Sequence, residues 1–185
     1  MNKIALTGHT SGLGLAIHTQ YPMAVGFSRS NNYDLLNSDN ITKMLEQIDD
    51  CNIFINNAFP ALAADKVEGM STQLDILYKV YQLWEQENDK LIINLGSNTS
   101  DGIKKHIWPY AASKAASDKA CEQLSYITSG PSVCNLRFGY IDMPHVNAFA
   151  PNEKKLPLTT ALATIQHIID SWHQGATVRE ITVIP

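Results

Sequence analysis

Short apolar runs alternate with longer amphipathic segments throughout this chain of 185 residues. A short apolar run predicts a buried strand, and apolar residues that recur every three or four positions predict a helix. The expected strands are 3–6, 23–28, 51–56, 91–95, 133–138 and 180–184, and the expected helices are 11–20, 38–48, 71–87, 110–129 and 159–174. Because strands and helices alternate, the pattern predicts a doubly wound α/β fold: a parallel sheet between two helical layers, with right-handed crossovers.

The turn between the first expected strand and helix is rich in glycine. Gly8, Gly12 and Gly14 stand in the pattern Thr-Gly-x-x-x-Gly-x-Gly. Glycine lets a phosphate approach the backbone closely, and the following helix offers free N–H groups and the positive end of its dipole. This arrangement is typical of the phosphate-binding corner of Rossmann-type dinucleotide folds. The alternative is a tight strand–helix turn whose glycines serve packing alone.

The end of the second expected strand bears on the choice of dinucleotide. In such folds an acidic residue there binds the free ribose 2′-hydroxyl of NAD, whereas an arginine accommodates the 2′-phosphate of NADP. Here Ser28 is followed by Arg29, with no Asp or Glu beside it. A guanidinium matches phosphate oxygens in a bidentate fork, so NADP(H) is favoured over NAD(H). A solvated loop arginine is the other interpretation.

Three polar residues are expected at the carboxyl edge of the sheet, where ligands of such folds bind. Ser97 follows a strand, and Tyr110 and Lys114 lie four residues apart, on one face of the next helix. A nearby cation favours the phenolate and would lower the pKa of the tyrosine, which could then pass a proton to a carbonyl oxygen during hydride transfer. Ser97 could orient the same oxygen. A Tyr-x-x-x-Lys pair alone also arises by chance on helix surfaces.

Taken together, these motifs resemble those of the short-chain dehydrogenase/reductase (SDR) family, and the chain is similar to an unusually short member. The matching residues occur in the family's order: Thr7-Gly8-x-x-x-Gly12-x-Gly14, Asp34-Leu35, Asn56-Asn57-Ala58, Ser97, Tyr110-Ala111-Ala112-Ser113-Lys114 and Gly139-Tyr140-Ile141. The resemblance implies a Rossmann-type, NAD(P)-binding fold that lacks the helix after the second strand, because only residues 30–33 precede Asp34.

The resemblance also implies a role for each matching residue. Ser97, Tyr110 and Lys114 would be the catalytic set. The expected cofactor-binding residues are Gly8, Thr10, Ser11, Gly12, Leu13 and Gly14 in the turn, Ser28 and Arg29 at the ribose, Asp34 and Leu35 beside the adenine, Asn57 and Ala58 along the adenosine ribose, Tyr110 and Lys114, and Gly139 and Ile141 at the nicotinamide.

The chain departs from the family pattern at several positions. Phe59 stands where the family has the glycine of Asn-Ala-Gly, and Met143 replaces a threonine. The helix asparagine that supports a proton-relay water would fall near Leu77 or Tyr78, where the chain has none. The lid, residues 143–158, and the loop 98–108 are expected to shape the substrate pocket, with His106, Trp108, Tyr140 and His145 as candidate wall residues.

Composition narrows the remaining possibilities. The formal net charge is −4, and the 14 basic residues are scattered, so neither nucleic acid nor an anionic membrane is an expected partner. The three cysteines show no Cys-x-x-Cys spacing, which argues against a zinc site and for a reduced, cytoplasmic protein; no metal is expected. The length suits one domain over residues 1–185, without a signal peptide or a membrane span.

The sequence therefore predicts an NADP(H)-dependent oxidoreductase that interconverts a carbonyl and an alcohol of a small molecule. The alternative is a non-catalytic NADP(H)-binding or sensing protein that keeps the fold; the presence of Ser97, Tyr110 and Lys114 together argues against it, because a pure binder has little need for Ser97. The small-residue face of the helix that starts near Tyr110 resembles the family's pairing surface, so a homodimer or homotetramer is a possible assembly.

Overall fold

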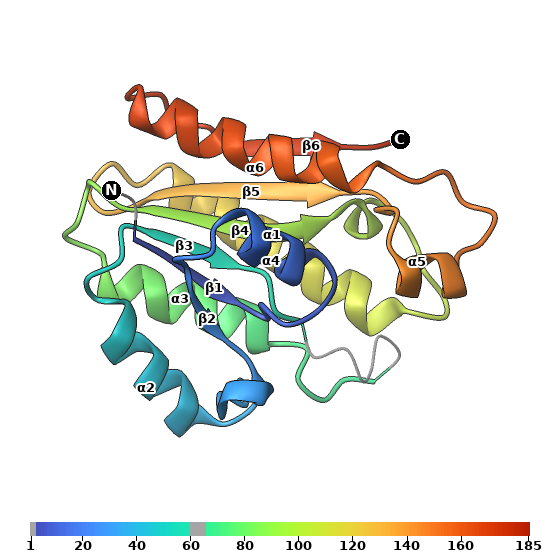
Figure 1. Ribbon diagram of the computed structural model, residues 1–185, viewed down its shortest axis with the longest axis horizontal. Coiled ribbons are helices and arrows are strands. Elements are labelled where there is room, and N and C mark those ends of the chain that lie inside the picture. The colour runs from blue at the N-terminus through green and yellow to red at the C-terminus, as the bar shows by residue number, and fades with distance from the viewer. Residues whose placement is uncertain (1–2, 60–65) are drawn as a thin grey trace.

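The strands form a single parallel sheet in the computed structural model, which describes residues 3–59 and 66–185. Within those residues the six strands are ordered β2-β1-β3-β4-β5-β6, and each neighbouring pair is parallel (Figure 1). Their bounds are β1 Ile4–Thr7, β2 Val25–Phe27, β3 Ile53–Asn56, β4 Leu91–Ser97, β5 Ser132–Phe138 and β6 Glu180–Val183. The Rossmann-type doubly wound fold is thereby confirmed.

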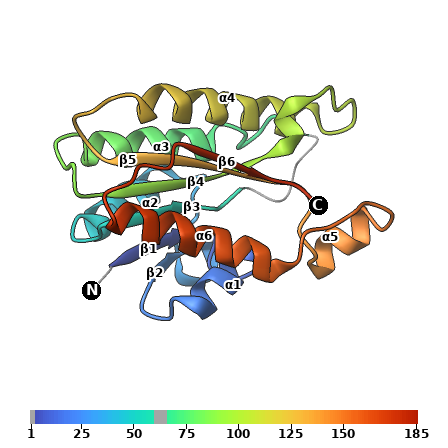
Figure 2. The ribbon, with the colours of Figure 1, turned by 90° about the horizontal axis from the view of Figure 1, so that it is seen from above.

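Helices cover both faces of the sheet (Figure 2). The helices are α1 Gly12–Gln20, α2 Ser38–Ile48, α3 Thr72–Leu83, α4 Trp108–Ser125, α5 Pro144–Phe149 and α6 Leu158–His173, with short 3₁₀ turns η1 Arg29–Asn31 and η2 Asn98–Asp101. Helices α1 and α6 pack on one face, whereas α2, α3 and α4 pack on the other. In both views α5 lies beyond the carboxyl ends of the strands.

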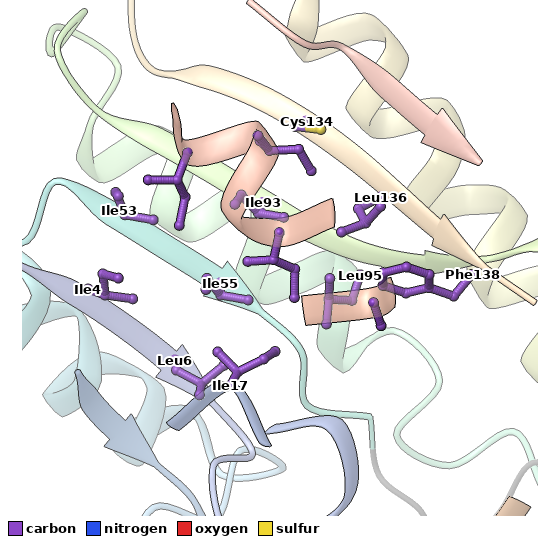
Figure 3. Packing of buried hydrophobic residues seen from close by; sticks show 14 of the residues in the cluster. Ile4, Leu6, Ile17, Ile53, Ile55, Ile93, Leu95, Cys134, Leu136 and Phe138 are labelled. Atoms are coloured by element: carbon purple, nitrogen blue, oxygen red, sulfur yellow. The ribbon is translucent and has the colours of Figure 1, made fainter. Parts of the chain in front are cut away.

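Alternation along each strand divides the core into two apolar clusters. Leu6, Ile55 and Ile93 point toward α1 and α6, together with Leu95, Leu136 and others (Figure 3). The residues between them, such as Phe54 and Ile92, point toward α2, α3 and α4. Successive strand residues point to opposite faces, so strands buried on both sides read as the continuous apolar runs seen in the sequence.

Two local expectations need correction. The second strand is only Val25–Phe27 rather than 23–28, because Ala24 donates its N–H to Tyr21 and so closes the turn that leaves α1. The lid contains a helix, α5, that the sequence did not predict. Pro144 fixes the start of this helix. With only six residues, the helix is too short to show a repeat of apolar residues every three or four positions. Part of the expected loop from Phe59 to Met70, residues 60–65, lies outside the described residues.

The segment after β2 agrees with the expected missing helix. Ser28 is the N-cap of η1, and the side chain of Asn31 accepts a hydrogen bond from the Ser28 N–H at 2.8 Å. Asn32 then takes a left-handed conformation (φ 67°) and the chain turns directly to Asp34. The next α-helix is α2, which packs on the opposite face from α1.

Candidate active site

The glycine turn is fixed by the neighbouring strand as well as by its own glycines. The Thr7 hydroxyl accepts hydrogen bonds from the N–H groups of Asn57 (3.0 Å) and Ala58 (2.9 Å), and the Asn57 amide donates to Thr7 O at 2.9 Å. A Cβ on Gly14 would lie 2.0 Å from Gly8 O, so only glycine fits there. Packing therefore explains Gly14 without any ligand, as the alternative interpretation of the motif anticipated.

Gly12 requires a different explanation. Its backbone is left-handed (φ +54°), and among the described residues a Cβ there would meet only the side chain of His145, at 3.2 Å. The Ser11 side chain makes no capping hydrogen bond, and the first turn of α1 has no acidic residue. Among the described residues no side chain caps the N–H groups at the start of α1, so these groups could bind an anion, which the positive end of the helix dipole would favour. This corner fits a dinucleotide diphosphate.

The end of β2 lies next to this corner. The Ser28 and Ser30 hydroxyls are 2.8 Å apart, and Asn31 ties the turn down by donating to Gly26 O at 2.7 Å. Arg29 is exposed and forms no ion pair with the described residues. A braced turn thus presents the exposed Ser30 hydroxyl and the Arg29 guanidinium, which suits a phosphate group, whereas Ser28 is buried.

The two residues expected beside the adenine differ in exposure. Leu35 is buried in the cluster under α2 and α3, whereas Asp34 is exposed and its carboxylate accepts a hydrogen bond from the Leu36 N–H at 3.1 Å. A cavity of about 550 Å³ opens beside Leu35, between α2 and α3. Asp34 therefore stabilises the turn before α2 whether or not it also faces a ligand.

Ser97 and Tyr110 meet where β4 ends and α4 begins. The Ser97 hydroxyl donates to the Thr99 hydroxyl at 2.9 Å, and it forms a hydrogen bond with Tyr110. Burial raises the pKa of Tyr110 above its usual range, and the hydrogen bond with Ser97 only partly opposes this effect. The lowered tyrosine pKa that the sequence predicts is therefore wrong for this structure, because desolvation of the phenol is the largest cause and raises the pKa.

Lys114 is buried beneath Tyr110, with only 3% of its surface exposed. Its Nζ lies 5.6 Å from the centre of the Tyr110 ring and donates hydrogen bonds to Gln73 Oε1 (2.6 Å) and Leu95 O (2.7 Å). None of the ion pairs among the described residues includes Lys114. Burial without a paired carboxylate lowers the pKa of Lys114 to about 8.

Phe59 occupies the space beside these two residues. Its ring packs edge-on against Tyr110, with 4.7 Å between the ring centres, and lies 5.4 Å from the Lys114 ammonium. An aromatic ring excludes water, and it attracts a cation over its face. The replacement of a glycine by Phe59 therefore makes the site drier and more enclosed on this side.

A row of buried amides, which sequence reasoning missed, supports Lys114 from below. Asn56, Asn94 and Asn135 are register partners on β3, β4 and β5. Asn56 donates to Asn94 (3.0 Å), Asn94 to Asn135 (3.5 Å), and Asn135 to Asp118 (2.9 Å). We call these three residues the asparagine ladder. Their signal in the sequence was the presence of asparagine in three otherwise apolar runs, at the end of the run 51–56 and inside the runs 91–95 and 133–138.

Gln73 of α3 joins the asparagine ladder to Lys114. It is fully buried, and its amide nitrogen donates to Asn56 O (2.9 Å) and Leu95 O (3.0 Å). The Asn56 side chain returns a hydrogen bond to Gln73 O at 2.8 Å. Each polar atom of the Gln73 side chain thus has a partner, and its oxygen is directed at Lys114.

The lid is anchored at both ends. Ile141 forms a parallel bridge with Leu156, and the flanking hydrogen bonds run from Leu156 N to Tyr140 O (2.7 Å) and from Asp142 N to Leu156 O (2.8 Å). Val146 of α5 is buried in the core cluster, so α5 is docked over the carboxyl end of the sheet. The lid thereby brings His145 to Gly12.

The remaining expected residues are divided between the two ends of the site. Gly139, beside the end of β5, donates its N–H to Val183 O at 2.9 Å, and Ile141 is buried in the core. Of the candidate wall residues, His145 reaches the glycine turn, and Tyr140 packs against Phe149 of the lid. Trp108 begins α4 and remains 58% exposed.

Neither a metal cluster nor a membrane helix occurs in the described part of the chain. No group of three or more His, Cys, Asp or Glu side chains there is arranged to hold a metal ion. The helices at residues 3–59 and 66–185 include none that is long and apolar enough to cross a membrane.

Comparison with solved structures identifies the architecture. A 4-hydroxyisoleucine dehydrogenase mutant complexed with NADH and succinate superposes with a TM-score of 0.80 at 18% identity, over 98% of this chain and 97% of that chain. A short-chain dehydrogenase from Sphingobium yanoikuyae in complex with NADPH gives 0.77 at 16% identity, over 100% and 88%. This chain has the short-chain dehydrogenase fold.

A third match with this fold is a closed form of serine dehydrogenase complexed with NADP⁺, with a TM-score of 0.76 at 19% identity over 98% of this chain and 94% of that chain. No protein-family model matches the sequence. No curated protein matches it either. The resemblance to the SDR family therefore rests on short motifs and on the fold. In this chain the glycine turn, Ser97, Tyr110 and Lys114 all lie at the carboxyl edge of the sheet.

Proposed function

We propose that this protein is an NADP(H)-dependent oxidoreductase that interconverts a carbonyl and an alcohol. The contact between Ser97 and Tyr110, above the buried ammonium of Lys114, is the observation that carries the proposal. The structural neighbours support it, since their names include dehydrogenases complexed with NADH, NADPH and NADP⁺. One domain, residues 1–185, would hold both cofactor and substrate.

The cofactor would lie along the carboxyl edge of the sheet. Gly8, Thr10, Ser11, Gly12, Leu13 and Gly14 would hold the diphosphate, because the start of α1 offers uncapped N–H groups. Asn57 and Ala58 would border the adenosine ribose, Asp34 and Leu35 the adenine, and Gly139 and Ile141 the nicotinamide. When bound, the nicotinamide supplies or accepts the hydride.

In the reductive direction, this chain's residues would handle the proton and the charge. The Tyr110 hydroxyl would donate its proton to the substrate carbonyl oxygen, and Ser97 would hydrogen-bond the same oxygen. The Lys114 ammonium would then stabilise the phenolate that remains. Two of its three N–H donors are held by Gln73 and Leu95, so one remains for the pocket.

The preference for NADP(H) rests on the turn after β2. Arg29 is exposed, has no carboxylate partner among the described residues, and stands between Ser28 and Ser30. Arg29→Ala should weaken NADPH binding at least about tenfold, since one charge-assisted pair is worth roughly 1.5–3 kcal/mol, and leave NADH binding nearly unchanged. Titrations of both nucleotides would measure this, and an equal loss for the two would remove Arg29 from the phosphate site.

Turnover is the direct test of the enzyme assignment. The natural protein and the Tyr110→Phe variant are mixed with NADPH and panels of aldehydes, ketones and quinones, and the absorbance of NADPH is followed. The natural protein should oxidise NADPH with at least one carbonyl substrate, and Tyr110→Phe should lose most of that rate because it lacks the proton donor. Equal rates for the two proteins would contradict the mechanism.

A non-catalytic NADP(H)-binding protein is the second candidate. The enclosure of Tyr110 and Lys114 by Phe59 favours it, because this ring restricts access to both polar groups. Tight NADPH binding without turnover on the whole carbonyl panel would select this candidate.

A further inference from the structure

We propose that Gln73 is a positioning residue that holds the Lys114 ammonium by a direct hydrogen bond and sets the protonation equilibrium of that lysine. The inference deepens the proposed function, because Lys114 belongs to the catalytic set proposed above. It concerns a contact inside the protein, however, and can be tested without any substrate or cofactor.

The first argument is the geometry of the contact. Gln73 Oε1 lies 2.6 Å from Lys114 Nζ, and both side chains are buried. The second acceptor, Leu95 O, is a backbone carbonyl in the middle of the sheet. Lys114 is therefore held by two neutral acceptors, one of which is a replaceable side chain.

The second argument is that Gln73 cannot turn away. Its amide nitrogen is committed to Asn56 O and Leu95 O, which fixes the orientation of the amide and directs Oε1 at Lys114. Asn56 belongs to the asparagine ladder, so the position of Gln73 is set by β3 and β4 together. A flexible acceptor could follow the lysine, but this one is rigid.

The third argument concerns charge. The ionisable groups that act on Lys114 are Asp118 and Cys121, both on α4, and Tyr110 packs against it. The Asp118 carboxylate is engaged by Arg137 Nε at 3.2 Å and by the hydroxyl of Ser100 at 2.5 Å. Because its charge is already compensated, the acceptor that most directly stabilises the ammonium is Gln73. Removing or charging that acceptor should change the ionisation of Lys114.

Two substitutions at position 73 separate positioning from general loosening. Gln73→Glu keeps the shape and places a carboxylate against Lys114, which should raise its titration midpoint by roughly one to three pH units. Gln73→Met keeps the bulk but removes the acceptor, and should lower the midpoint further. Simple loosening would admit water and raise the midpoint in both variants, so the sign of the change in Gln73→Met is diagnostic.

The experiment is an NMR titration of protein labelled with ¹³C at the lysine side-chain Cε, with the Lys114 resonance identified by its loss in Lys114→Met. Gln82→Glu, at an exposed position on the same helix, is the matched control and should leave the midpoint unchanged. The natural protein should give a midpoint well below that of its exposed lysines. Opposite changes in Gln73→Glu and Gln73→Met support the proposal. An unchanged midpoint in Gln73→Glu, or a rise in Gln73→Met, overturns it.

Circular dichroism checks that both variants fold. If neither does, the titration midpoint of Lys114 in the natural protein is the test, and a midpoint equal to that of the exposed lysines overturns the proposal. The link to catalysis has a separate readout. Gln73→Glu neutralises the cation beside Tyr110, so the pH profile of alcohol oxidation should move to higher pH. Absence of turnover with opposite midpoint changes would refute the proposed function and leave the role of Gln73 standing.

Discussion

Replacing Lys114 with methionine should change the free energy of unfolding by an amount that depends strongly on pH. Burial lowers the pKa of Lys114 from its ordinary 10.5 to about 8 in the folded protein. Between these values the unfolded chain binds the proton more tightly than the folded chain does. The natural protein therefore gains stability as the pH rises from below 8 to above 10.5, and the variant lacks this gain.

The size of the effect follows from the same two pKa values. One pKa unit is worth about 1.4 kcal/mol, so the buried charge costs the folded natural protein about 3 kcal/mol at neutral pH. Between pH 7 and pH 10 the natural protein should gain roughly 2–3 kcal/mol relative to Lys114→Met. The variant also leaves Gln73 Oε1 without its Lys114 partner and removes one of the two side-chain hydrogen bonds to Leu95 O, but this cost is independent of pH and shifts the whole curve by a constant.

Urea unfolding of both proteins from pH 7 to pH 10, followed by tryptophan fluorescence, measures the difference, and Trp84 is a fully buried reporter. Ionisation of cysteines and tyrosines at high pH affects both proteins, so most of it cancels in the difference. Lys119→Met, at an exposed position on α4, is the control and should give a flat curve. A pH-independent difference for Lys114→Met would refute the account of Lys114 as a buried lysine without a carboxylate partner.

Two further predictions concern the core. Gly14→Ala should destabilise the protein by at least about 2 kcal/mol, because its Cβ would lie 2.0 Å from Gly8 O. The control is Gly102→Ala, which has nothing within 4 Å of its Cβ and should change stability by no more than about 0.5 kcal/mol. Thermal denaturation of the two variants measures the difference. The three cysteine thiols are buried and burial raises the pKa of each, so an aromatic disulfide reagent at pH 8 should react with them far more slowly in the native protein than in urea. Comparable rates in the two states would contradict their burial.

The sequence predicted the architecture well because the pattern of burial is simple. Strands covered on both faces produce continuous apolar runs, and every expected strand and long helix is present within a few residues of its expected bounds. Helix α5 could not be predicted, since a helix of six residues shows no period and depends on its contacts with the core. The spacing of apolar residues was sufficient to predict an element only where the packing of the folded protein favours the same element.

The candidate site was predictable only in part. Ser97, Tyr110 and Lys114 were found because a motif places them on adjacent elements, and their roles stay predictions. Gln73 could not be assigned to Lys114, because the two are 41 residues apart and meet only when α3 and α4 pack together. The effect of burial on Tyr110 was also beyond the sequence, since it depends on which side chains, such as Phe59, exclude water around the phenol.

The asparagine ladder also bears on how the chain selects a single alignment of its strands. Side chains alternate between the two faces of a strand, so a slip of one residue in β3, β4 or β5 would turn an asparagine into the apolar cluster beneath α1 and α6. There its amide would have no partner, at a cost of about 1–3 kcal/mol for each polar group left unsatisfied. Parallel strands are joined by long crossovers and receive no register information from tight turns. The ladder asparagine at the end of β3 and those in the middle of β4 and β5 therefore supply register information that the connections cannot, and they penalise each slip that would move an asparagine to the opposite face of the sheet.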